Sequence, residues 1–242
     1  MKRFIALILT LVMTSLALFS CGDVVQGGSD RTDEYGTDAC EYATSRDTTG
    51  RNVGYVEICV EKYGKIVLLL DATTAEQTVK NFIGLVKAGF YDTPTDPESK
   101  TPYGNTFHLV DPGFVIQGGC PNHDGTGHLT NPIKGEFASN GYFGNDIKHL
   151  RGVISMVRTD DPNSASAQFF ICHADLAHLD GNYASFGYVI RGMSVIDELM
   201  EDYAQYADPE NAGMIFDVEN QPVIKYIRWI PDNDGYWRSQ HS

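Results

Sequence analysis

The feature that most constrains the fold is a series of short β-rich runs separated by loops rich in glycine, proline and asparagine. Two runs, 54–60 and 66–71, flank the turn "EKYGK", which is typical of a β-hairpin. The other runs lie at 105–110, 114–119, 152–158, 167–173, 185–190 and 222–230. Only two stretches have helical periodicity. The pattern therefore predicts a mainly β fold, a closed eight-stranded antiparallel β-barrel capped by two α-helices.

The two helices are predicted within 73–90 and within 193–207. In the first, Thr73 or Thr74 is a candidate N-cap, and Gly89 is expected to end the helix. The apolar face of this helix contains Val79, Phe82, Ile83 and Val86. Such a face is expected to pack on one end of the barrel.

The N-terminal residues have the pattern of an export signal. Lys2 and Arg3 precede an apolar run that ends at Ser20, and Cys21 follows. This arrangement resembles a bacterial lipobox, in which the cysteine is lipidated and becomes the mature N-terminus. The alternatives are a plain signal peptide cleaved nearby and an uncleaved anchor, for which the run is short. All three place the domain outside the cytoplasm, and lipidation would attach it to a membrane.

The chain is accordingly divided into four parts: a signal peptide (1–20), a flexible tether (21–52), a single domain (53–230) and a C-terminal tail (231–242). The tether is assigned because 22–52 is rich in Gly, Ser, Thr and Asp and has almost no apolar periodicity. Within the domain, 91–104 and 205–221 are predicted to be exposed loops.

The charge of the chain argues against nucleic acid as a partner. There are 32 acidic and 18 basic residues, a formal net charge of −14, and no cluster of Lys or Arg offsets it. Phosphate backbones would repel such a surface. We expect a monomer that does not bind nucleic acid.

The cysteines beyond Cys21 leave two interpretations open. Cys40 and Cys59 would be able to pair, since an exported location permits disulfides. Alternatively, Cys59 and Cys172 are free buried thiols.

Three long motifs stand in a fixed order. They are "TFHLVDPGFVIQGGCPNHDGTG" (106–127), "GVISMVRTDDPNSASAQFFICHAD" (152–175) and "HLDGNYASFGYVIRGMSVID" (178–197). Their order resembles that of the cyclophilin family of peptidyl-prolyl cis-trans isomerases, and 76–92 is similar to that family's first helix. The resemblance runs from about Val56 to Ile230 and implies proline-containing segments of exported or unfolded proteins as substrates.

Rotation about an X-Pro bond has a barrier of about 18–20 kcal/mol, because amide resonance must be broken. A catalyst needs an apolar pocket for the proline ring, hydrogen bonds to the flanking backbone and a donor for the imide nitrogen. No cofactor, metal or Ser-His-Asp signature is needed for this chemistry.

The resemblance implies a pocket around the proline ring. Its members would be Phe114, Val115, Phe170, Leu179 and Tyr183. Val115 departs from the family, which usually has methionine there. Taken alone, each aromatic residue would be read as ordinary barrel core.

The resemblance also implies polar positions around this pocket. The family's catalytic positions fall on His108, Leu109, Phe114 and Gln117. Gln117 would hydrogen-bond the substrate backbone, and His108 and His178 would lie on the rim. Three further residues would line or support the peptide groove: Val157, Arg158 and Gln168.

Leu109 is the main departure from the family. Active cyclophilins have arginine directly after this histidine, and its guanidinium is the donor for the imide nitrogen. Leucine cannot donate, and loss of one preorganised donor costs about 2.7–4 kcal/mol in enzymes where it has been measured. Arg158 is not an evident replacement, because relatives that keep the first arginine also carry one there.

Four residues of metal-ligand type lie within 21 positions: His108, Cys120, His123 and His128. The Gly-rich loop between them gives no sign that the side chains converge, so loop histidines in solvent are the preferred interpretation. The same loop lacks the Gly-Lys-Ser/Thr ending of a phosphate-binding loop.

Three hypotheses follow. The first is a membrane-tethered prolyl isomerase that assists the folding of exported proteins, with activity reduced by Leu109. The second is a proline-peptide-binding module or chaperone on the same fold, which turns over poorly. The third, a structural surface lipoprotein, does not explain an intact apolar pocket.

Overall fold

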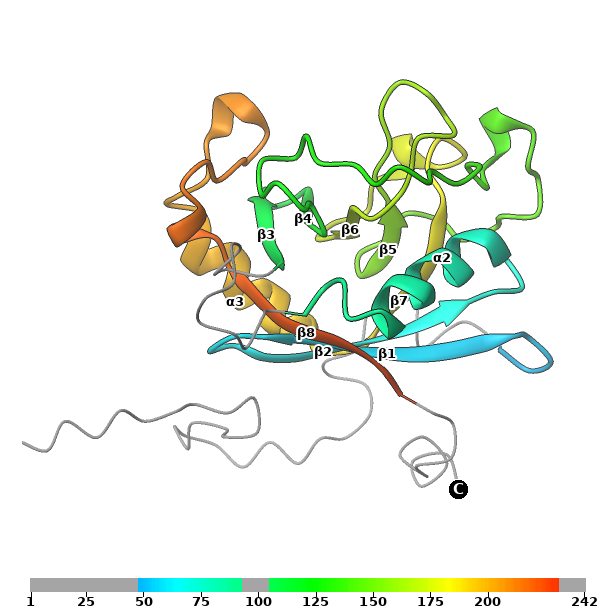
Figure 1. The fold of residues 1–242 in the computed structure, drawn as a ribbon, viewed down its shortest axis with the longest axis horizontal. Coiled ribbons are helices and arrows are strands. Elements are labelled where there is room, and N and C mark those ends of the chain that lie inside the picture. Colours follow the sequence, from blue (N-terminus) through cyan, green and yellow to red (C-terminus); the bar gives the residue numbers. More distant parts are fainter. Residues whose placement is uncertain (1–47, 93–104, 231–242) are drawn as a thin grey trace, which may run out of the picture.

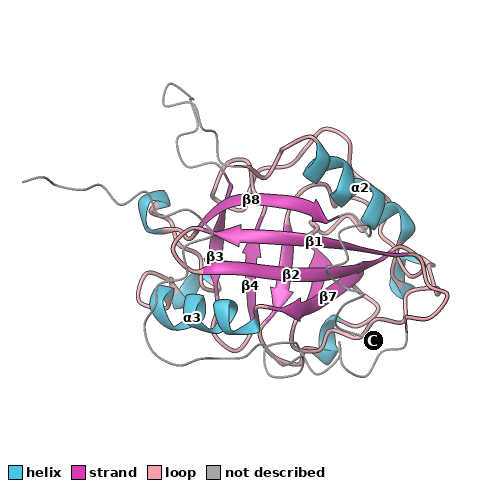
Figure 2. Ribbon diagram, turned by 90° about the horizontal axis from the view of Figure 1, so that it is seen from below, coloured by secondary structure: helices cyan, strands magenta, loops and turns pink. Residues whose placement is uncertain are grey.

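Eight antiparallel strands close into a barrel in the order β1-β2-β7-β5-β6-β4-β3-β8 (Figures 1 and 2). This computed structural model describes residues 48–92 and 105–230. Helices α2 and α3 lie on opposite sides of the barrel in both views. The predicted fold class, an eight-stranded barrel with two α-helices, is confirmed.

The strands are β1 (Val53–Val60), β2 (Gly64–Asp71), β3 (Asn105–Val110), β4 (Val115–Gly118), β5 (Val153–Met156), β6 (Phe169–Cys172), β7 (Ser185–Arg191) and β8 (Val223–Ile230). The helices are α2 (Glu76–Lys87) and α3 (Met193–Tyr203). Short 3₁₀ helices are η1 (Ala138–Asn140), η2 (Ala177–Leu179), η3 (Pro209–Asn211) and η4 (Val218–Asn220).

The predicted hairpin is formed by β1 and β2, which pair from Val53 with Asp71 to Val60 with Gly64. In β1, Val56 and Ile58 are fully buried while Tyr55 is only half-buried. Alternate side chains of a strand point to opposite faces, so this pattern directs one face of β1 into the barrel.

The barrel core contains a cluster of aromatic rings around Phe82 of α2. Its ring meets Phe169 of β6 edge-on at 5.6 Å and lies 5.3 Å from the ring of Tyr91 and 5.3 Å from that of Phe186. Aromatic pairs prefer such tilted or edge-to-face arrangements. The predicted apolar face of α2 is confirmed, although Ile83 is only half-buried.

The N-terminus of α2 differs from the prediction. The N-cap is Ala75, which has no side-chain cap, so neither Thr73 nor Thr74 serves there. The distant Glu136 accepts hydrogen bonds from the backbone N–H groups of Gln77 (3.0 Å) and Thr78 (2.8 Å). A buried carboxylate thus accepts hydrogen bonds from two N–H groups of the first turn that have no partner within the helix, and it interacts favourably with the helix dipole.

The C-terminus of α2 follows the prediction. The N–H of Gly89 donates to the carbonyl of Val86, and Gly89 has a φ of +68°. This left-handed conformation favours glycine and ends the helix.

Replacing Glu136 with alanine is expected to destabilise the fold. Glu136 is 2% exposed and also accepts from the Thr78 hydroxyl at 2.7 Å, so three donors would lose a charged acceptor. We expect a loss of about 2–3 kcal/mol in the free energy of unfolding, measured by urea denaturation. The control Glu201→Ala removes an exposed carboxylate from α3. Equal stability of the two variants would contradict this role.

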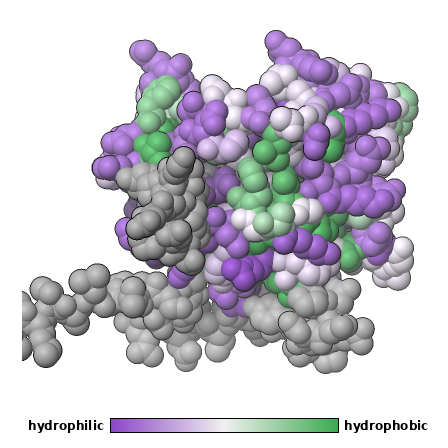
Figure 3. Space-filling model, viewed as in Figure 1, coloured by the Kyte–Doolittle hydropathy of each residue, from purple (hydrophilic) through white to green (hydrophobic). Residues whose placement is uncertain are grey.

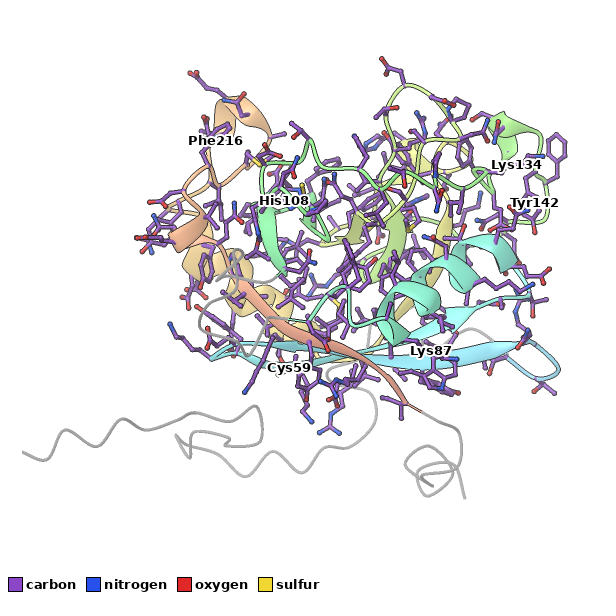
Figure 4. The ribbon with its side chains drawn as sticks, viewed as in Figure 1. Cys59, Lys87, His108, Lys134, Tyr142 and Phe216 are labelled. Atoms are coloured by element: carbon purple, nitrogen blue, oxygen red, sulfur yellow. The ribbon has the colours of Figure 1, made fainter. Side chains whose placement is uncertain are left out.

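The 205–221 segment is only partly the exposed loop that was predicted. It pairs with β3, since the N–H of Ile215 donates to the His108 carbonyl and that of Val110 to the Gly213 carbonyl, both at 2.9 Å. Ile215 is 1% exposed, whereas Phe216 is 64% exposed. Figure 3 shows one of the larger apolar areas of this face on that loop, where Figure 4 labels Phe216. The segment therefore covers the end of β3.

Two residues assigned to the tether are bound to the barrel. Arg51 Nε lies 2.6 Å from a carboxylate oxygen of the buried Asp71, and the Asn52 N–H donates to Thr73 Oγ1. The contacts of the barrel therefore extend to Arg51 and Asn52, just before Val53.

Cys59 is disulfide-bonded, so the free-thiol interpretation is wrong for it. Cys172 is a free buried thiol, as is Cys120. Cys21, Cys40, the signal peptide, 93–104 and the C-terminal tail lie outside the described residues. Within the described part of the chain, no helix is both long and apolar enough to cross a bilayer.

Candidate active site

One pocket gathers eight of the residues that the sequence singled out. It has a volume of about 110 Å³ and opens to solvent. Its lining residues are Phe114, Val115, Gln117, Val157, Arg158, Phe170, Leu179 and Tyr183. Of the other candidates, His108, Leu109, Gln168 and His178 do not line it. Six of the eight have apolar or aromatic side chains, which suits an apolar ring as the ligand.

The pairing of β4 with β6 positions three of these side chains. Gln117 lies directly opposite Phe170 in the register, and Val115 is two residues from Gln117. Residues two apart share a face, so all three lie on the pocket side of the sheet. Their neighbours Ile116 and Ile171 are fully buried on the other face.

The aromatic rings of the pocket form two groups. Phe170 and Tyr183 meet edge-on with centroids 5.8 Å apart, and the buried ring of His149 stacks behind Phe170 at 6.0 Å. At the outer edge, exposed His178 stacks on Phe114 at 6.1 Å with planes 11° apart. These contacts hold the pocket walls in defined orientations, which reduces the ordering cost of ligand binding.

Gln117 is oriented by a chain of hydrogen bonds. Its Nε2 donates to Gln168 Oε1 at 3.0 Å, and Gln168 Nε2 in turn donates to the carbonyls of Gly125 and Gly127 at 2.9 and 2.8 Å. Gln168 is 2% exposed, whereas Gln117 is half-buried at the pocket. With its amide nitrogen engaged, Gln117 can offer its carbonyl oxygen to a substrate N–H.

His108 was expected on the rim and instead lies beneath the pocket. Its side chain is fully buried on β3, and its Nε2 lies 3.2 Å from Gln117 Nε2 (Figure 4). Burial lowers the pKa of His108 to about 4, and nearby His123 adds to this effect. His108 is therefore neutral near pH 7 and supports Gln117 from behind.

The depressed pKa of His108 predicts an acid-sensitive fold. Because the unfolded chain binds a proton near pH 6.5 and the folded chain only near pH 4, stability is full above about pH 6.5 and is lost as pH falls toward 4. His108 alone accounts for about 2 kcal/mol of lost unfolding free energy between pH 7 and pH 5.

Urea denaturation of the natural protein and of His108→Gln at pH 7 and pH 5 checks this prediction. Between the two pH values, the variant should lose about 2 kcal/mol less unfolding free energy than the natural protein. Buried His149, whose pKa is also lowered by burial, gives both proteins a common background. The control His128→Gln changes an exposed histidine. An unchanged pH dependence in His108→Gln would show that folding does not lower the pKa of His108.

Leu109, the position where the resemblance predicts a donor in active cyclophilins, supplies no polar group. It is 8% exposed, lies opposite Gln117 in the β3–β4 pairing and forms a bridge with Met214. The leucine is thus packed beside the pocket as part of the barrel wall.

The candidate metal ligands do not form a site. Within 48–92 and 105–230, no group of three His, Cys, Asp or Glu side chains is placed to hold an ion. His123 Nδ1 instead lies 3.0 Å from Thr106 Oγ1, and Cys120 is buried with its Sγ near Asp124.

A hydrogen-bonded array beside the pocket, formed by His149, Asp180 and Ser155, was not predicted from the sequence. His149 Nδ1 lies 3.1 Å from Asp180 Oδ1, and His149 Nε2 lies 3.1 Å from Ser155 Oγ. These are the residue types of a hydrolytic triad, but Ser155 is fully buried and cannot reach a substrate carbonyl. The array braces Phe170 and Tyr183. Asp180 and Ser155 are 31 and 6 positions from His149, so only the fold shows that the three side chains meet.

Comparisons with known proteins agree with this geometry. The family model described as cyclophilin type peptidyl-prolyl cis-trans isomerase/CLD matches residues 55–220. Peptidyl-prolyl cis-trans isomerase A of Dickeya dadantii is 39% identical over 166 residues, 66% of this chain and 76% of that protein. Peptidyl-prolyl cis-trans isomerase B of Bacillus subtilis is 40% identical over 134 residues, 55% of this chain and 82% of that protein.

Solved structures show the same fold. A cyclophilin type peptidyl-prolyl cis-trans isomerase of Cryptosporidium parvum superposes with a TM-score of 0.60 and 26% identity, covering 75% of this chain and 99% of that one. The same protein, solved in the presence of the dipeptide Ala-Pro, gives a TM-score of 0.59. The chain therefore belongs to the cyclophilin-type peptidyl-prolyl cis-trans isomerase family and is an isomerase.

Proposed function

We propose that this isomerase assists the folding of exported proteins and turns over more slowly than relatives with arginine at position 109. The observation that carries the reduced rate is the combination of a complete proline pocket with buried Leu109 beside Gln117. Binding is retained by the pocket, while the donor that favours the twisted amide is absent.

The pocket supports catalysis by positioning. The apolar walls hold the proline ring, and Gln117, fixed by Gln168, accepts a hydrogen bond from the substrate backbone. Holding one side of the X-Pro bond while the other rotates needs no covalent step. The Ala-Pro dipeptide used with the Cryptosporidium parvum relative is a ligand of this chemical class.

A second candidate function is a proline-binding chaperone with little turnover. Leu109 favours it, because the leucine is integrated into the wall through its pairing with Gln117 and Met214. Both functions require binding of proline-containing segments, and they differ only in the rate of prolyl isomerisation.

The first test compares the natural domain with Leu109→Arg in a protease-free prolyl isomerisation assay monitored by NMR exchange. A guanidinium beside Gln117 restores one preorganised donor, so kcat/KM should rise by about 10²–10³. Leu109→Met is the matched control, since it changes shape without adding a donor. Peptide affinity should change little among the three proteins.

The outcomes separate the two functions. A natural rate above the uncatalysed one, raised by the arginine variant, supports a slow isomerase. Peptide binding without any acceleration in the natural protein supports the chaperone. Equal rates in the natural and arginine proteins would refute the proposed effect of Leu109.

The exported, lipid-anchored location is also part of this proposal. The signal pattern before Cys21 supports it, and so does the disulfide at Cys59, since structural disulfides persist mainly in oxidising compartments. A lipid on Cys21 would place the isomerase at the membrane surface where exported chains emerge.

Lipidation is tested by expressing the full chain in a bacterium supplied with labelled palmitate. The natural chain should incorporate label and sediment with membranes, and Cys21→Ser should do neither. A control, Cys120→Ser, changes a buried free thiol and should still be labelled. Labelling that survives Cys21→Ser would exclude Cys21 as the attachment point.

A further inference from the structure

The proline pocket contains one charged residue. Of the eight lining residues, Arg158 alone has a charge, and it lies just after β5 beside Tyr183. It is half-buried, so its charge is only partly screened by solvent. A cation in this position is adjacent to any peptide that seats a proline ring in the pocket.

The guanidinium of Arg158 is held in place. Its carbon lies 4.6 Å from the ring centroid of Tyr183 and 5.4 Å from that of Phe137. Nε donates to the Asn182 carbonyl at 3.0 Å, and Nη1 donates to the Thr159 carbonyl at 2.7 Å. Stacking and two hydrogen bonds fix the plane of the group before a ligand arrives, which lowers the cost of using it.

The charge of Arg158 has no carboxylate partner among the described residues. Arg51, Arg151 and Arg228 each lie within 4.0 Å of an aspartate oxygen, at 2.6, 2.7 and 3.4 Å. Arg158 makes no such pair, in a chain with 32 acidic residues. Its two bonds use two of the five guanidinium N–H groups, so three donors remain.

From these observations we infer that Arg158 selects proline-containing segments with a carboxylate next to the proline. A fixed guanidinium with spare donors matches the planar geometry of a carboxylate, and charge-assisted bonds of this kind are stronger than neutral ones. The inference rests on the proposed use of the pocket for proline. It adds a selectivity that an apolar pocket by itself does not have.

The other role open to Arg158 is structural, because it ties the segment around Thr159 to Asn182. That role predicts equal effects of substitution on all peptides. Selection of a carboxylate predicts an effect on acidic peptides alone, so the ratio of two affinities distinguishes the roles.

The experiment uses NMR titration of the natural protein with matched short peptides. One pair carries Glu or Gln directly before proline, and a second pair carries Glu or Gln directly after it. We expect at least one Glu peptide to bind about three- to tenfold more tightly than its Gln partner at low salt. The ratio should fall toward one in 0.5 M NaCl, because salt screens charge.

In Arg158→Gln, the ratio of the affinities for the Glu and Gln peptides should fall to about one. In Arg158→Lys, part of the preference for Glu should remain, because lysine retains the charge without the planar guanidinium. The control Lys62→Gln removes a charge from the exposed β1–β2 turn and should leave the ratio unchanged. Heteronuclear NMR spectra confirm that each variant is folded.

Each outcome has a defined meaning. If all peptides bind the natural protein equally, the inference about Arg158 is refuted while proline binding stands. If no peptide binds, the proposed use of the pocket fails first. If Arg158→Gln weakens Glu and Gln peptides alike, the residue is structural.

Discussion

The pairing of β4 with β6 is the constraint on which the site depends. It sets Gln117 opposite Phe170 on the pocket face and buries Ile116 and Ile171 on the barrel face. A slip of one residue would exchange these faces, exposing two isoleucines and burying a glutamine side chain. The strand register that buries the two isoleucines in the barrel therefore also assembles the pocket, so the burial of the core stabilises the site.

Around the pocket, a network of buried and half-buried polar groups holds the walls in place. Gln168 fixes the amide of Gln117, and His149 stacks on Phe170 while bridging Asp180 and Ser155. Buried polar groups are costly unless they are hydrogen-bonded, so each such contact restricts the site to one arrangement. Neutral histidines serve this purpose well near pH 7, because they bond without carrying a buried charge.

The strands and most of the pocket residues could be predicted from the sequence. The features that could not be predicted are contacts between segments that are distant in the sequence. The β-rich runs and the Gly/Pro/Asn loops between them indicated the strands, and the resemblance of the motifs located Phe170 and Gln117 at the pocket. The support of α2 by Glu136 and the burial of His108 were missed, because both depend on loops that pack against distant elements. Local sequence carries no information on which remote carboxylate replaces a cap.

Positions 109 and 158 together suggest how binding energy is used in this isomerase. A group that acts only on the twisted amide raises kcat, whereas a group that holds substrate and transition state equally raises affinity alone. Leu109 lacks the first kind of interaction, and Arg158 is placed to provide the second. An enzyme with this balance would hold its clients longer for each turnover than a relative with both arginines. Such residence would suit a domain that shields proline-containing segments as well as isomerising them, so the proposed isomerase and the proposed chaperone differ only in the rate of turnover.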